Sequence, residues 1–258
     1  MSISKLDKWR GDDALNVQRR RMNEALAKVG QFKPAPREIP EGHLIFALDL
    51  TASREAGLAQ ARIGTAAMFA ALRSIGAIAV KLIYFRGENE CRESGWENDP
   101  EILSRIMRQL SCESGETQIA RLLRRVLNRA DEEVSAVVFV GDHCEEKAGE
   151  LGELAAALGE RRIPVYVFHE IADDDQRSLR ARPVFRRIAA ASGGVYCEFK
   201  PNSGVVLREM LSSVAAFSAA GIEGVREIGP ATAPEARQLQ KRLLLLGPGN
   251  PDGKGGRR

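Results

Sequence analysis

The sequence predicts an α/β fold: a doubly wound, mostly parallel sheet with helices on both faces and one short antiparallel edge strand. Three observations predict it. Short, continuous apolar runs recur through the middle of the 258-residue chain, as in strands that are buried on both faces. Most of these runs are followed by a longer segment with helical character. The alternation of strand and helix is typical of a parallel sheet.

The strands are expected at the apolar runs, which cover residues 44–50, 77–85, 134–140, 163–168 and 194–199. A turn at Gly87 predicts that residues 90–95 return as the antiparallel edge strand. Helices are expected at residues 55–74, 100–110, 117–130, 146–160, 176–192 and 204–219. The second of these starts with Asp99 as N-cap and Pro100 in the first turn.

The chain divides into three parts. Residues 1–38 form a basic N-terminal arm, with one helix at 13–29 and a Pro-containing linker at 33–36. Residues 39–229 form the α/β domain. Residues 230–258 contain a short helix at 234–246, followed by a basic Gly/Pro-rich tail that we expect to be disordered.

Composition excludes several classes. With 44% hydrophobic and 28% charged residues, the chain is neither collagen-like nor a disulfide scaffold. Residues 1–38 and 230–258 each carry a net charge of +4, so the middle carries −5, which does not indicate a nucleic-acid partner. No apolar stretch approaches the roughly 20 residues of a membrane span. Four cysteines without a secretory signal predict reduced thiols and a cytoplasmic protein.

Polar side chains gather where two of the predicted strands end. Side chains alternate in an extended segment, so Asp49, Thr51 and Ser53 project to one side after the first strand. Asp142 follows the strand at 134–140, and Thr117 precedes a helix between them. The carboxyl ends of parallel strands form the edge at which open α/β sheets bind ligands. Two carboxylates and three hydroxyls are hard oxygen ligands, which suit Mg²⁺ or Mn²⁺ better than zinc.

These residues resemble the metal-ion-dependent adhesion site of von Willebrand factor A-like (VWA) domains. The family pattern is Asp-x-Ser-x-Ser after the first strand, a Thr in a later loop and an Asp after the fourth strand. Asp49-x-Thr51-x-Ser53, Thr117 and Asp142 follow it in order, with Thr51 in place of the commoner Ser. The resemblance covers about residues 42–220 and implies a Rossmann-like VWA fold. We expect no enzymatic activity, because the motifs of the common phosphate-binding and hydrolase sites are absent from the sequence.

The resemblance also implies a protein-binding or adaptor module, as in intracellular members that work beside AAA+ ATPases in multi-protein machines. Because two carboxylates only balance a divalent ion, we expect the partner to supply an Asp or Glu side chain to the metal. Arg54, Glu116 and His143 flank the ligands and are expected to form the rim that contacts this partner.

Several alternatives stay open. Taken singly, four of the ligands could cap a helix instead: Asp49, Ser53, Thr117 and Asp142. Cys112, His143 and Cys144 could gather at the same edge, although their spacing matches no zinc pattern. A metal-dependent phosphohydrolase that uses Asp49 as nucleophile is the runner-up function, and a metal-free scaffold is the third. The sequence contains no Gly-rich phosphate loop and no nucleophile elbow after the first strand.

Overall fold

The computed structural model of the chain describes residues 42–72, 78–129 and 132–246. The helix expected at 13–29, the linker at 33–36 and the tail at 247–258 lie outside the described residues. Six strands form one sheet in the order β3-β2-β1-β4-β5-β6. Their bounds are β1 (Gly42–Asp49), β2 (Ile78–Arg86), β3 (Glu90–Glu97), β4 (Val134–Gly141), β5 (Val165–Glu170) and β6 (Tyr196–Phe199). Only the β2–β3 pair is antiparallel, which confirms the predicted fold class and the edge strand.

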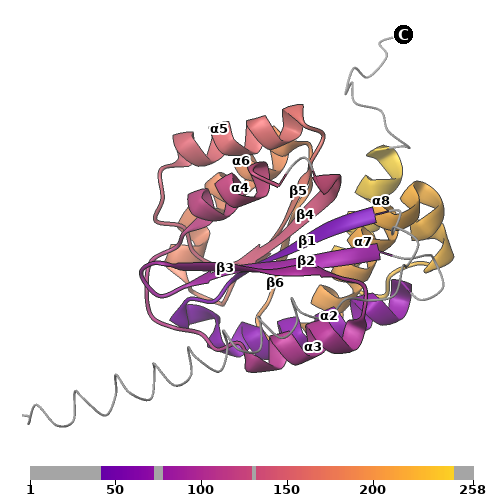
Figure 1. Cartoon of the computed structure of the whole chain (residues 1–258), viewed down its shortest axis with the longest axis horizontal. Coiled ribbons are helices and arrows are strands. Elements are labelled where there is room, and N and C mark those ends of the chain that lie inside the picture. Colours follow the sequence, from indigo (N-terminus) through magenta and orange to yellow (C-terminus); the bar gives the residue numbers. More distant parts are fainter. Residues whose placement is uncertain (1–41, 73–77, 130–131, 247–258) are drawn as a thin grey trace, which may run out of the picture.

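Helices cover both faces of the sheet (Figure 1). One face carries α2 (Glu55–Leu72), α3 (Pro100–Gln109), α7 (Gly204–Glu227) and α8 (Pro234–Leu246). The other face carries α4 (Ile119–Leu127), α5 (Ala148–Glu160) and α6 (Gln176–Ser192). Alternating residues of β1 supply both cores: Leu44, Phe46 and Leu48 face the first set of helices, while Ile45 and Ala47 face the second.

The order of the strands creates a switch point between β1 and β4. The chain leaves β1 through α2 to reach β2 on one side, whereas β4 pairs with β1 on its other side. Connections that leave neighbouring strands in opposite directions open a crevice at the carboxyl ends of those strands. The register pairs Leu48 with Val140, so Asp49 and Asp142 both lie at this crevice.

Helix α7 is longer than the predicted segment. It breaks at Ala220 and Gly221, which leave helical geometry where the predicted helix ends, and it then continues to Glu227. By length and composition α7 meets the requirements of a membrane span, with a mean hydropathy of 1.4 over its most apolar window, although no spanning segment was expected. Leu207, Leu211 and Val214 are fully buried in the core, as in the central helix of a packed domain.

Helix α8 belongs to the same packed body as the sheet. Ala236, Leu239 and Leu243 have no exposed surface and lie in the core cluster with α7 and β6. The Gln240 side chain accepts a hydrogen bond from the Ala231 N–H at 2.8 Å. The domain boundary drawn at residue 229 is therefore too early, because residues 230–246 complete the core on this face.

Candidate metal centre

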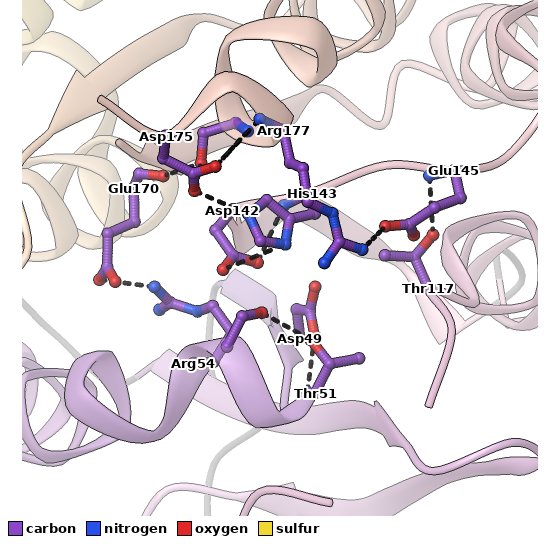
Figure 2. Close-up of polar contacts among 12 residues, drawn as sticks. Asp49, Thr51, Arg54, Thr117, Asp142, His143, Glu145, Glu170, Asp175 and Arg177 are labelled. Carbon is purple, nitrogen blue, oxygen red and sulfur yellow. Dashed lines mark hydrogen bonds and ion pairs between the residues drawn. The ribbon is translucent and has the colours of Figure 1, made fainter. Parts of the chain in front are cut away.

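Two carboxylates meet at the switch point. Asp49 is the last residue of β1 and is 1% exposed, and Asp142 directly follows β4 and is 5% exposed. Figure 2 shows both side chains in one polar cluster. The Asp49 Oδ1 atom accepts a hydrogen bond from the Thr51 N–H at 2.8 Å, while Oδ2 is buried without a hydrogen-bond partner. Burial, followed by the charge of Asp142, raises the pKa of Asp49 to about 7.

Asp142 is positioned by two histidines. Its Oδ1 accepts a hydrogen bond from the His143 N–H at 2.8 Å. Its carbonyl oxygen accepts one at 2.9 Å from Nε2 of His169, which therefore carries the proton. Burial lowers the pKa of His169 to about 4, so this ring is neutral at physiological pH. His169 therefore holds the Asp142 backbone at the crevice without adding a positive charge.

Two predicted hydroxyl ligands lie together after β1. The Thr51 and Ser53 hydroxyls are 3.2 Å apart; Thr51 is buried and Ser53 is exposed. Thr51 lies in a short parallel bridge with Glu113, whose N–H donates to the Leu50 carbonyl oxygen at 3.0 Å. The loop between α3 and α4 thus fixes the backbone around the hydroxyls.

Thr117 is held by the loop that follows β4. Its side chain is 7% exposed, and its hydroxyl accepts a hydrogen bond from the Glu145 N–H at 3.4 Å. The N-cap of α4 is Gln118, and Glu146 accepts the N–H groups of Ile119 and Ala120 at 2.5 and 2.9 Å. Because the Glu146 carboxylate accepts the free N–H groups at the start of α4, Thr117 does not cap this helix. The helix begins later than predicted.

The capping alternative therefore fails at the other sites too. The short helix after Thr51 has no side-chain cap, and the N-cap of α5 is Lys147 rather than Asp142. By contrast Asp175, which follows two further aspartates in the sequence, caps α6 by accepting the Arg177 N–H at 2.9 Å.

Arg54 is not on the rim, contrary to expectation. Its side chain is 1% exposed, and Nη1 forms an ion pair with Glu170 Oε2 at 2.5 Å. Glu170 is the last residue of β5 and thus a third carboxylate at the same edge. Glu170 was not predicted from the sequence, although its place at the end of a buried strand matches that of Asp49.

The rim contains other groups (Figure 2). Glu116 is exposed, as expected. His143 was also expected on the rim, but it is buried at 7% exposure, with its Nε2 atom 2.7 Å from Asp175 Oδ2. Arg177, which sequence analysis also missed, reaches from the start of α6 to Glu145 at 2.8 Å and leaves most of its side chain exposed.

The thiol alternative finds no support. Cys112 and Cys144 are partly buried, and burial is the main cause that raises the pKa of each thiol to about 12, so both are protonated. Within the described parts of the chain, no three His, Cys, Asp or Glu side chains gather in a way that could hold a metal. A metal at the crevice would be bound by two carboxylates and by hydroxyls. The buried, unpartnered Asp49 Oδ2 beside Asp142 fits such an ion.

Solved structures with a similar fold include the vWF domain of the type V pili tip protein Mfa5 from Porphyromonas gingivalis. It is 9% identical with a TM-score of 0.54, over 72% of this chain and 98% of that one. The pilus adhesin SpaC from Lactobacillus rhamnosus GG is 13% identical with a TM-score of 0.53, over 69% of this chain and 30% of the SpaC chain. The SpRpn10 VWA domain is 12% identical with a TM-score of 0.49, over 69% of this chain and 95% of that one.

A scan against protein-family models finds no match for this sequence, and neither does a search of the curated proteins. The likeness to solved structures shows the fold: the described residues have the α/β fold of VWA domains, which the sequence resemblance implied. It spans less than a third of the SpaC chain.

Proposed function

We propose that the chain binds a divalent cation, Mg²⁺ or Mn²⁺, at the crevice between β1 and β4. The proposed ligands are Asp49, Thr51, Ser53, Thr117 and Asp142. The observation that carries the proposal is the buried Asp49 Oδ2, which has no hydrogen-bond partner and lies beside a second carboxylate. An unpaired charge at such a place is costly, and a cation removes this cost.

The metal would serve to bind a protein. With two carboxylates balancing the ion, an open coordination position favours an anionic oxygen, so the partner supplies an Asp or Glu side chain. The exposed Ser53, Glu116 and Arg177 surround this position and set specificity. We infer a cytoplasmic adaptor module that works in a multi-protein complex, with an AAA+ ATPase as one class of partner. The fold shared with a pilus tip domain supports a binding role over catalysis.

The test is a pull-down from the native cell in Mg²⁺ and in EDTA. We expect the captured partner to bind in Mg²⁺, to be released by EDTA, and to bind Asp142→Ala at least about tenfold more weakly. Glu223→Gln, which neutralises an exposed carboxylate on α7, is the matched control and should bind normally. Neutralising the acidic residues of the partner one by one should identify the one that reaches the metal. Binding that ignores both the chelator and every neutralisation would contradict the proposal.

Thr117→Ala is expected to weaken binding much more than folding. The hydroxyl accepts one long hydrogen bond from the Glu145 N–H and can donate to the carboxylate of Glu145 or Glu146, so its loss should cost about 1–2 kcal/mol of stability. As a metal ligand, however, it has no replacement in the alanine variant. Calorimetry with Mn²⁺ should show a loss of affinity of about tenfold, while thermal melts in EDTA stay close to wild type. Thr117→Ser keeps the hydroxyl and should behave like wild type; equal losses in both variants would exclude Thr117 as a ligand.

The phosphohydrolase alternative predicts that the pure protein hydrolyses a phosphate ester in Mg²⁺, whereas the binding function predicts no turnover. With 1% of Asp49 exposed, a substrate phosphorus atom has little access to its carboxylate. We expect no Mg²⁺-dependent hydrolysis of a generic phosphate ester by the pure protein. Turnover that disappears in Asp49→Asn would favour the phosphohydrolase. A protein that binds no metal in calorimetry would be the scaffold.

A further inference from the structure

The crevice contains a cation of its own, the guanidinium of Arg54. It lies at the start of α2 and is fully enclosed, with its Nη1 atom 2.5 Å from Glu170 Oε2. Its Nε atom is buried and has no hydrogen-bond partner. A buried guanidinium needs carboxylates nearby, because the free-energy cost of burying it without an opposite charge would be prohibitive.

The strand register brings Arg54 beside the proposed metal ligands. Leu48 pairs with Val140 and Gly141 with His169, so Asp142 lies between Asp49 and the Glu170 that holds Arg54. Burial alone would lower the pKa of Arg54, but the charges of Glu170, Asp142 and Asp49 together raise it. Arg54 in turn is one of the groups that lower the pKa of Asp49. Arg54 therefore interacts with all three carboxylates at the ends of β1, β4 and β5.

The fold leaves room for this ion pair. A Cβ atom at Gly57 would lie 2.5 Å from Glu170 Oε2 and 2.6 Å from Arg54 Nη1. Only glycine at this position lets α2 approach the pair so closely. Asp49, Asp142, Glu170 and Arg54 together carry a formal charge of −2, which equals the charge that one divalent cation neutralises.

We propose that Arg54 is the resident counter-ion of the metal-free crevice, and that Glu170 holds it away from the metal position. This inference deepens the proposed function and rests on it. The guanidinium and the metal compete for the same carboxylates, and Glu170 sets the strength of that competition. Glu170 and Arg54 are positioning residues, and neither is a metal ligand.

Two variants should change metal affinity in opposite directions. In Glu170→Gln, Arg54 loses its partner and pairs with Asp49 and Asp142, so affinity for Mn²⁺ should fall about tenfold. In Arg54→Met with Glu170→Gln, the competing cation is gone, and affinity should rise about tenfold above wild type. The measurement is calorimetric titration of the full chain with Mn²⁺. A purely structural role would lower affinity in both variants, and that result would overturn the proposal.

The control is a second half-buried ion pair far from the crevice, Lys81 Nζ with Glu132 Oε2 at 2.7 Å. Lys81→Met with Glu132→Gln should leave Mn²⁺ affinity unchanged, which separates a local charge effect from general destabilisation.

A second measurement tests Arg54 without metal. In EDTA, urea unfolding of Arg54→Met with Glu170→Gln should shift the midpoint downward, and adding Asp142→Asn should recover half of that shift or more. If wild type binds no Mn²⁺ but this recovery occurs, the proposed function fails and the role of Arg54 stands. If no recovery occurs, Arg54 is not the counter-ion of Asp142 and the inference is wrong.

Discussion

Asp49→Asn is expected to abolish metal binding and, in EDTA, to make the protein more stable than wild type. Burial and the charge of Asp142 raise the pKa of Asp49 from 3.8 to about 7 in the folded state. The folded state therefore disfavours the ionised side chain above pH 7, by about 4 kcal/mol as an upper bound. Asparagine has no charge to bury, and its Oδ1 atom can still accept the Thr51 N–H.

The sign of the pH dependence follows from the raised pKa. Above pH 7, wild type carries the full penalty and the melting temperature of Asp49→Asn should be several degrees higher. Between pH 7 and 4 the advantage should shrink, and below about pH 4 it should vanish, because Asp49 is then protonated in both states.

Thermal melts in EDTA and in Mg²⁺ check both halves of this prediction. Mg²⁺ should raise the melting temperature of wild type by mass action and leave that of Asp49→Asn unchanged. The exposed Glu223→Gln should follow wild type throughout. A variant that is less stable than wild type in EDTA at pH 8 would mean that the Asp49 charge is already satisfied, and the case for a cation would fall.

Truncation after residue 229 is expected to unfold the domain, whereas truncation after residue 247 should leave it intact. The shorter chain loses Leu239 and Leu243, which are fully buried, and uncovers the core side of β6. It also loses the segment whose Thr232 and Ala233 N–H groups donate to the Glu209 carboxylate at 2.9 and 2.8 Å. Each buried leucine contributes about 2–5 kcal/mol, which together approaches the whole stability of a domain.

Circular dichroism and thermal melts of the two truncations test this prediction. Leu239→Ala and Leu243→Ala should each lower the melting temperature by about 5–15 °C, and Leu245→Ala, at an 86% exposed position, should change it little. A cooperative, wild-type-like melt of the chain ending at 229 would restore the boundary drawn from the sequence. Removing residues 1–36 together with residues 248–258 is expected to have no large effect on the melting temperature.

The strands and the two carboxylates of the crevice were predictable because each depends on a local signal. A continuous apolar run marks a buried strand; Asp49 is the last residue of one such strand, and Asp142 directly follows another. Parallel pairing then places both at the same edge. Thr117 needed the family pattern, since its place depends on a contact with Glu145 that no local signal reveals.

The environment of Arg54 was not predictable in the same way. A charged residue after Asp-x-Thr-x-Ser is expected at the surface. Its burial depends on Glu170, which is distant in sequence, and on the space left by Gly57. The domain boundary at residue 229 was wrong for a related reason, because a composition change near residue 230 indicates a boundary even where the chain folds back onto the core.

The break in α7 limits how far the molecule extends. A straight helix of 24 residues would measure about 36 Å, whereas the eight-residue strand β1 measures about 27 Å. Gly221, at φ 60° and ψ −142°, adopts a conformation that only glycine takes readily, and a Cβ there would meet nothing within 4 Å. The chain thus turns within the height of its sheet, and the non-helical dihedral angles of Ala220 and Gly221 let the last helix return over the core side of β6.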